Sequence, residues 1–223
     1  MIMIKLKDIS VKFVQGQKTI TVLNDVNFSL NKAKIVTIVG KSGSGKTTLL
    51  KVISGLIQPN SGVVYLDNNN ISQLSLEKRR LRCSEYIGFI WQDFKLIDEL
   101  TVENNILLPL QIHKKKKDND FYSQLLKQLD IEHLVKKYPS QLSGGEKQRC
   151  AIARALITKP KIIIADEPTG SLDIYTADNI SQLFLKSVKQ FTELVIIVTH
   201  DQKLAQIGDE KYEMIDGKVV MCE

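Results

Sequence analysis

The stretch GKSGSGKT, residues 40–47, decides the expected fold of this 223-residue chain. It fits the pattern G-x-x-x-x-G-K-[ST] without a mismatch. A β-branched apolar run at 35–39 precedes it and a helix-like pattern begins at Thr48, so the motif has the strand–loop–helix context that it needs. Its glycines let the backbone wrap around an anion with the N–H groups pointing inward, and the helix start adds the positive end of its dipole. The stretch therefore predicts a phosphate cradle.

Two side chains at the end of this stretch indicate what the cradle holds. Lys46 offers a positive charge to the outer phosphates, and the hydroxyl of Thr47 suits Mg²⁺. The alternative is a Gly/Ser-rich turn that merely contains a lysine. The agreement of strand, spacing and helix argues against that alternative.

Two neighbouring acids, Asp166 and Glu167, follow the apolar run 162–164 and precede a proline. Ligands of a parallel sheet sit outside the carboxyl ends of its strands, so we expect these acids to emerge beside the bound phosphates. Asp166 would then reach Mg²⁺, and Glu167 would polarise the water that attacks the γ-phosphate. The alternative, that both acids only cap the next helix, leaves the buried strand and the cradle unconnected.

The rest of the pattern predicts an α/β chain. Alternating stretches at 9–13 and 19–23 flank a polar turn at 15–18 and predict an antiparallel strand pair. The apolar runs at 35–39, 162–165 and 194–198 are typical of strands buried on both faces of a parallel sheet.

Residues from about 92 to 160 lack such runs and show apolar residues at helical spacing, which predicts a helical insertion. Within this region, the charged residues 113–120 predict a solvated loop.

Composition sets broad limits on the class of protein. The 31 Lys+Arg against 25 Asp+Glu leave a net charge of +6, too mild to indicate nucleic acid or an anionic membrane by itself. The cysteines Cys83, Cys150 and Cys222 are odd in number and widely spaced, which predicts neither a disulfide framework nor a zinc site and favours a reducing cytosol. The first residues are too charged for a signal peptide, and no apolar run approaches the ~20 residues of a bilayer crossing. We therefore expect any membrane role to depend on a partner.

The stretch LSGGEKQR, residues 142–149, resembles the signature sequence of the ATP-binding subunit of ABC transporters, and the resemblance covers essentially the whole chain. Its chemistry can also be read directly. Ser143-x-x-Glu146 is a capping box that opens a helix expected to run to Pro160, and two glycines bare the backbone at the positive end of that helix. This arrangement predicts an anion site.

The resemblance implies an α/β P-loop NTPase (ABC ATPase) with a mixed, largely parallel core sheet, an N-terminal antiparallel β subdomain and a helical subdomain insertion. It implies one ABC ATPase domain over 1–223, with a RecA-like core at about 1–91 and 161–223 and a helical subdomain at about 92–160. Gln92, the loop 171–173 and His200 match the family's motifs in order, and Phe13 stands where the family places an aromatic on adenine.

The resemblance implies a role for each matching residue. It implies catalytic roles for Glu167, His200 and Gln92, and metal binding by Thr47, Gln92 and Asp166. It implies nucleotide contacts from Phe13, Gly40, Lys41, Ser42, Gly43, Ser44, Gly45, Lys46, Thr47, Thr48, Ser143, Gly144, Gly145, Glu146 and Asp173.

The resemblance also implies partners. ATP with Mg²⁺ would be held between two copies, or between this chain and a homologous subunit, and an integral-membrane permease would be the membrane partner. Residues 94–105 mix apolar residues with acids, which suits a groove for a helix of that permease; the alternative is that they are buried locally. The protein would then be cytoplasmic and peripheral on the inner face of the cell membrane. The branch that it most resembles serves lipoprotein release, macrolide and peptide export and antimicrobial-peptide resistance.

The sequence leaves two other functions to consider. One is an ATPase that regulates a membrane complex without transporting cargo, as in cell division. The other is a nucleic-acid-linked ABC ATPase, against which the short span from Lys46 to Gln141, without a heptad run, argues strongly. No nucleic-acid partner is therefore expected.

Overall fold

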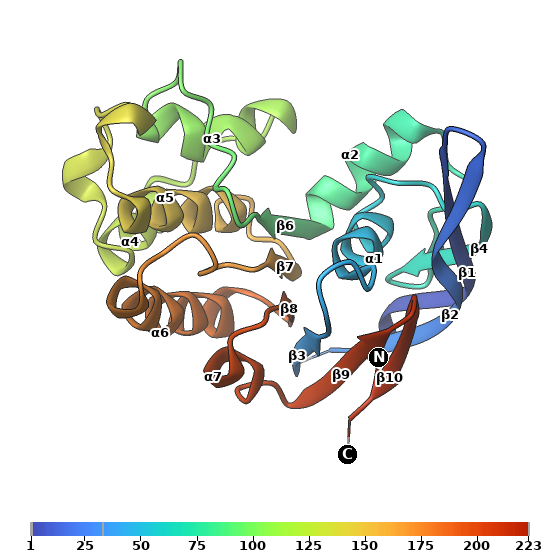
Figure 1. Cartoon of the computed structure of the whole chain (residues 1–223). Coiled ribbons are helices and arrows are strands. Elements are labelled where there is room, and N and C mark those ends of the chain that lie inside the picture. The colour runs from blue at the N-terminus through green and yellow to red at the C-terminus, as the bar shows by residue number, and fades with distance from the viewer. Residues whose placement is uncertain (1, 33, 223) are drawn as a thin grey trace. The chain divides into compact units, whose positions relative to one another are not determined.

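The computed structural model describes residues 2–32 and 34–222. The chain forms two compact units, Met1–Ser84 with Glu193–Glu223, and Glu85–Thr192 (Figure 1). Within the described residues, no helix is both long and apolar enough to cross a bilayer. The expected division into a core and a helical subdomain at about 92–160 stays a prediction.

The first unit contains an antiparallel sheet with the strand order β2-β1-β4-β5. Its strands are β1 (Ile2–Gln15), β2 (Lys18–Asn31), β4 (Ser61–Leu66) and β5 (Asn69–Asn70). The predicted strand pair is confirmed and is longer than the two alternating stretches indicated, because the pairing continues from Gln15 opposite Lys18 to Ile2 opposite Asn31. Gly16, at φ +62, supplies the left-handed residue of the tight turn.

A second set of strands in this unit surrounds β3 (Lys34–Val39). It pairs in parallel with β8 (Leu194–Val198) and with β9 (Glu210–Ile215), and β10 (Lys218–Met221) runs antiparallel to β9. All five residues of β8 are buried, as the apolar run predicted. The helices of this part of the chain are α1 (Lys46–Ile53), α2 (Leu76–Tyr86) and α7 (Gln202–Ala205).

The second unit is mostly helical. Its two strands, β6 (Ile87–Ile90) and the fully buried β7 (Ile162–Asp166), pair in parallel. Four helices accompany them: α3 (Val102–Ile112), α4 (Asn119–Gln128), α5 (Gly144–Leu156) and α6 (Ile174–Phe191). Two 3₁₀ turns lie at Glu132–Leu134 and Pro139–Gln141.

Two predicted boundaries in this unit were wrong. The helix expected to reach Pro160 ends at Leu156, because Lys159 takes a left-handed backbone (φ +53) and its N–H bonds to the Leu156 carbonyl. The charged loop expected over 113–120 ends earlier: Asp118 caps α4 by accepting from the N–H of Phe121, so the last two residues of that stretch are helical.

Candidate active site

The loop between β3 and α1 has the conformation that its glycines require. Gly40, Gly43 and Gly45 have φ values of +149, +79 and +105, which other residues rarely adopt. A Cβ atom at Gly40 would lie 2.6 Å from the carbonyl oxygen of Met214, and one at Gly45 would lie 2.8 Å from that of Val22. The loop is therefore left-handed at all three glycines, and it is packed against β9 at Gly40 and against β2 at Gly45, which leaves no room for a side chain at these two positions.

The polar groups of this loop suit phosphate. Lys46 Nζ donates to the carbonyl oxygens of Gly40 (2.8 Å) and Lys41 (2.9 Å), so the ammonium lies inside the curve of the loop. Ser44 Oγ is buried and has no hydrogen-bond partner among the described residues. A buried hydroxyl without a partner is costly, and a bound phosphate oxygen would satisfy it.

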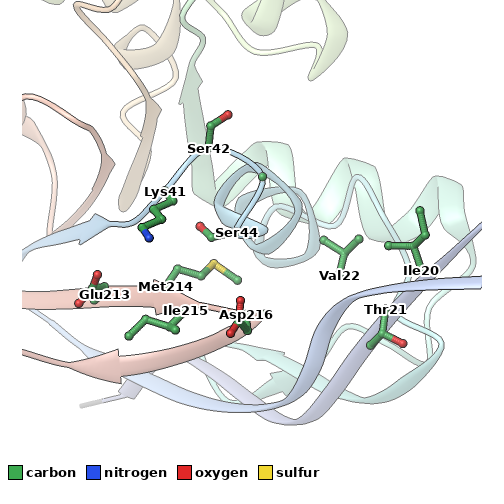
Figure 2. Close-up of a pocket in the computed structure, with 12 residues that line it drawn as sticks. Ile20, Thr21, Val22, Lys41, Ser42, Ser44, Glu213, Met214, Ile215 and Asp216 are labelled. Carbon is green, nitrogen blue, oxygen red and sulfur yellow. The ribbon is translucent and has the colours of Figure 1, made fainter.

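A cavity of about 630 Å³ opens beside this loop. Figure 2 shows the loop residues Lys41, Ser42 and Ser44 across from the β9 residues Glu213–Ile215. Its apolar part comes from Ile20 and Val22 of β2 and from Met214. The cavity is large enough for a nucleoside and combines apolar walls with a few polar groups, as small-molecule sites do.

Phe13, the expected adenine partner, does not line this cavity. It lies on β1, 43% exposed, and pairs across the hairpin with Ile20, which does line it. Sequence reasoning missed Ile20, Val22 and Met214 as site residues. The strand pattern predicted part of β2, but nothing in its spacing says that it forms a wall of the site, and Met214 lies on β9, far along the chain from the loop.

His200 follows β8 and lines a second cavity, of about 540 Å³, together with Gly40 and Lys41. The end of β3 and the end of β8 lie on the same edge because the two strands are parallel neighbours. The structure therefore brings this histidine to the start of the phosphate loop.

In the second unit, the two acids stand at the end of β7. Asp166 is the last residue of the strand and is 8% exposed, whereas Glu167 takes a left-handed backbone conformation with φ +49. The N–H of Gly170 donates to the carbonyl oxygen of Glu167 (3.0 Å) and closes a turn over 167–170. This turn projects the second acid out of the strand.

Gln92 lies against the same turn. A Cβ atom on Gly170 would sit 3.1 Å from Gln92 Nε2 and 3.3 Å from the Cβ of Glu167. Ser171 Oγ also donates to the carbonyl oxygen of Gln92 (2.9 Å). Gln92, which follows β6, therefore contacts the loop that carries the predicted general base.

The signature stretch forms the predicted capping box. Ser143 Oγ accepts from the N–H of Glu146 (3.3 Å), and the carboxylate of Glu146 accepts from the N–H of Ser143 (2.7 Å). The two glycines between them pack closely: a Cβ on Gly144 would lie 3.2 Å from Leu172, and one on Gly145 would lie 2.7 Å from Thr176. The bared start of α5 is therefore in contact with the segment that follows Glu167.

Asp173 is the N-cap of α6. Its carboxylate accepts from the N–H of Thr176 (3.0 Å), and hydrogen bonding from Thr176 lowers the pKa of this carboxyl below its ordinary value. Within the single chain, Asp173 thus has a helix-capping role.

The expected site residues fall into two groups. The first unit holds Phe13, the loop 40–47 with Thr48, and His200. The second unit holds Gln92, the signature residues 143–146, Asp166, Glu167 and Asp173.

The residues present fit Mg²⁺ beside a bound nucleotide. Among residues 2–32 and 34–222, no three His, Cys, Asp or Glu side chains gather into a metal cluster. Mg²⁺ next to phosphates commonly takes only one or two protein ligands, and Thr47 in the first turn of α1 supplies a hydroxyl of this kind.

The structure defines the class of protein as a P-loop nucleotide-binding protein. It has a buried strand, then a glycine loop with a lysine inside its curve, and then a helix that starts at that lysine. A family model described as "ABC transporter" matches residues 23–170. The "Lipoprotein-releasing system ATP-binding protein LolD" of Francisella tularensis subsp. tularensis (strain FSC 198) is 39% identical over 221 residues, 98% of this chain and 96% of that protein. The protein of the same name from Cytophaga hutchinsonii is 40% identical over 204 residues, 91% and 93% of the two chains.

Among solved structures, the dimeric post-hydrolysis state of the ATP-binding cassette MJ0796 bound to ADP and Pi is similar, with a TM-score of 0.88 and 38% identity over 97% of this chain and 96% of that one. The chain belongs to the ABC transporter family. It is an ATP-binding subunit that hydrolyses ATP, with Mg²⁺, to power a membrane transporter. The predicted family, with its likeness to the lipoprotein-release branch, the α/β P-loop fold and the ATPase activity are confirmed.

Proposed function

We propose that this chain is the ATPase of a lipoprotein-releasing system, that it acts as a pair, and that a permease holds it at the inner face of the cell membrane. The observation that carries the proposal is the likeness to lipoprotein-releasing ATP-binding proteins over 98% of this chain and 96% of the relative. A likeness over a single domain would support the ATPase alone, because one fold serves many functions. A likeness over the full length also covers the surface residues that meet a permease.

The first group of site residues binds the nucleotide in this proposal. The N–H groups of the loop 40–47 and the ammonium of Lys46 bind the phosphates, and the buried Ser44 hydroxyl donates to a phosphate oxygen. The adenosine part lies in the cavity walled by Ile20, Val22 and Met214. Phe13, the cross-strand neighbour of Ile20, would reach the adenine only from outside that wall. Thr47 of this group, together with Asp166 and Gln92 of the second group, would hold Mg²⁺ directly or through its water shell, and Mg²⁺ when bound would neutralise charge on the phosphate oxygens.

Residues of both groups take part in the chemistry. Glu167 of the second group accepts a proton from the attacking water, and Gln92 orients that water. His200, from the first group, holds the γ-phosphate. Because Gln92 contacts the turn that carries Glu167, a movement of the segment 94–105 on its permease would reach the general base directly.

The signature residues act across the pair. The start of α5 places the backbone of Gly144 and Gly145 at the positive end of a helix dipole, where an anion is favoured. In a head-to-tail pair, Ser143, Gly144 and Gly145 of one chain would meet the γ-phosphate held by the other. Loss of that phosphate on hydrolysis removes the contact, so the pair loosens and the permease is driven.

Replacement of the general base tests the assignment of the chemistry. Glu167→Gln keeps the size and the polarity of the side chain but cannot take a proton, so we expect ATP turnover to fall at least about a hundredfold while ATP binding is retained. Turnover is measured as phosphate release, and binding with a fluorescent nucleotide. Turnover equal to that of the wild type would remove Glu167 from this role.

The membrane function needs the native complex. We expect the tagged chain to copurify with a permease from inner membranes, and vesicles that contain this complex and a lipoprotein to release the lipoprotein to an acceptor only when ATP is added. The same vesicles carrying Glu167→Gln serve as the control. ATP hydrolysis without any release from vesicles with the wild-type chain would reject lipoprotein as the cargo and leave the ATPase assignment intact.

A further inference from the structure

Gln148, in the second turn of α5, makes a hydrogen bond to the loop that carries Glu167. The side chain is fully buried, and its Nε2 donates to the carbonyl oxygen of Pro168 at 2.6 Å. A carbonyl oxygen only accepts hydrogen bonds, so the amide nitrogen must be the atom that faces it. The amide oxygen of Gln148 has no partner among the described residues. The amide therefore stabilises the loop through its bond to the Pro168 carbonyl.

The residue before Pro168 needs such support. Glu167 has φ +49, a left-handed conformation that is unfavourable for a residue with a side chain and in which a following proline adds a clash. A conformation of this kind persists only where the surroundings enforce it. Here two hydrogen bonds hold the carbonyl groups of Glu167 and Pro168. The N–H of Gly170 donates to the Glu167 carbonyl at 3.0 Å, and Gln148 donates to the Pro168 carbonyl.

The helix that carries Gln148 also carries the signature residues. Its first turn packs Gly144 and Gly145 against Leu172 and Thr176, and its second turn holds Pro168. The loop 167–172 is therefore attached to α5 at both of its ends. The start of α5 and the general base then have a fixed relation within this unit.

We propose that Gln148 is a positioning residue for ATP hydrolysis: its amide holds the loop 167–172 on α5, which keeps Glu167 in its left-handed conformation and makes the general base follow every movement of the signature helix. The inference rests on the proposed role of Glu167. It predicts that the Gln148 bond matters for the chemical step and little for nucleotide binding or for folding.

Two variants remove the bond in different ways. Gln148→Met keeps the length of the side chain and removes both the donor and the unpartnered oxygen. Gln148→Asn keeps the amide but is one methylene too short to reach Pro168. We expect each to lower kcat about tenfold with KM for ATP within about twofold of the wild type, because a misplaced general base slows chemistry without removing a phosphate ligand. The melting temperature of Gln148→Met should stay close to that of the wild type, because an unpaired buried oxygen is lost together with the bond.

Gln128→Met is the matched control. Gln128 Nε2 donates to Ser187 Oγ at 3.0 Å between two helices of the same unit, so this change removes a similar bond that does not touch the loop 167–172. We expect its kcat to equal that of the wild type. An equal fall in kcat for Gln128→Met would mean that any loosening of the unit slows turnover, and would overturn the proposal.

A double variant of Gln148→Met and Glu167→Gln distinguishes a failure of the positioning role from a failure of the general-base role. If Gln148 acts through Glu167, Gln148→Met should leave the residual turnover of Glu167→Gln unchanged, because residues that act as one unit are not additive. A further tenfold loss in the double variant, or wild-type kcat in both single Gln148 variants, rejects the positioning role while the general base stands. Variants of Gln148 that cannot fold at all also reject it, because the bond would then be structural. Wild-type turnover in Glu167→Gln alone rejects the general base instead.

Discussion

Glu146, at the start of α5, makes a contribution to the stability of the protein that depends on pH. Its carboxylate accepts from the backbone N–H of Ser143, and this bond, with the one from the Ser143 side chain, lowers the pKa of the carboxyl below its ordinary value of 4.5. A carboxyl whose pKa is lower in the folded than in the unfolded chain binds protons more readily when unfolded. Its contribution to stability is therefore complete above about pH 4.5 and is lost as the pH falls through the lowered pKa.

We expect the variant Glu146→Gln to lose this pH dependence, because glutamine keeps an oxygen acceptor for the Ser143 N–H but has no charge. At pH 7 the variant should be less stable by about 0.5 kcal/mol, a small value because the side chain is partly exposed and solvent screens its charge. The measurement is urea unfolding of both proteins between pH 7 and pH 3.5. A stability gap of the same size at both ends of this range would show that the Glu146 charge does not stabilise the helix start.

Residues whose role depends on partners a few positions away could be predicted from the sequence. Residues whose hydrogen-bond partners lie far along the chain could not. Lys46 and the pair Ser143 and Glu146 follow spacing rules that operate within a few positions. Gln148 and Arg154 have partners 20 and 60 positions away, at the carbonyls of Pro168 and Phe94, and no local pattern encodes such contacts.

Arg154 illustrates the point. Its guanidinium donates to the carbonyls of Phe94 and Lys95, two consecutive residues with left-handed backbones at φ +60 and +49, and burial lowers the pKa of the arginine. The half-buried cation is balanced by backbone carbonyls that turn toward it. Only the folded chain brings these groups together.

At the level of elements, β6 and α5 approach one another at a glycine. A Cβ atom on Gly88 would overlap the carbonyl oxygen of Ala155 and would lie 2.7 Å from Ile163 Cδ1 of β7. Backbone atoms cannot move aside as a flexible side chain can. The strand therefore packs directly on the backbone of the helix that carries the signature residues.

We expect Gly88→Ala to destabilise the protein by about 2 kcal/mol or more, because the added methyl group forces a strand and a helix apart. Gly16→Ala is the comparison: its Cβ would meet nothing within 4 Å, so only the left-handed φ of +62 opposes it, at a cost of about 1 kcal/mol. Urea unfolding of the three proteins gives the two differences. If Gly88→Ala is no more destabilising than Gly16→Ala, the close approach of β6 and α5 is not as tight as described.

The buried strands and the capped helices could be predicted, whereas the exposed and short elements could not. Runs such as 162–164 and 194–198 have a single physical explanation, and all of them are buried strands. The helix α2 is rich in arginine and lysine, has little apolar periodicity and gave no prediction. The hairpin of β9 and β10 was missed although Asp216 and Gly217, with φ +46 and +75, form the type of turn that favours hairpins.

At the scale of the whole molecule, local motifs predict the phosphate loop and the signature turn, whereas the number of chains that complete the site is implied only by the resemblance to the family. The first unit holds the phosphate loop, and the second holds the signature residues and the general base. A capping box and a glycine loop are local signals. The pairing of two chains has no local signal and depends on surface side chains.

Two such side chains follow Asp173 directly. Ile174 and Tyr175 are 78% and 86% exposed, although both are large and apolar. They lie in the first turn of α6, next to the loop expected to cross to a second chain. Single exposed apolar residues are ordinary, but adjacent ones at an expected contact indicate a surface that is covered in the assembly.

We expect Glu167→Gln to form a stable pair with ATP, because the γ-phosphate that holds the two chains together is not removed. Light scattering after gel filtration should give about twice the 25.2 kDa of one chain with ATP and Mg²⁺, and the mass of one chain without nucleotide. Changing Ile174 and Tyr175 to serine in this background should weaken pairing at least about tenfold through the loss of buried apolar area, with ATP binding to the single chain unchanged.

Two controls make this test specific. Ile112→Ser removes an apolar side chain that is also exposed, at 59%, but lies at the end of α3, and it should leave pairing unchanged. Lys46→Ala should abolish ATP-dependent pairing because it weakens nucleotide binding itself, which separates loss of nucleotide from loss of contact. In the proposed pair, the start of α5 of one chain meets the phosphate held by the other chain. Single chains alone, with ATP bound and the permease present, would therefore contradict both the pairing and the role of the signature residues.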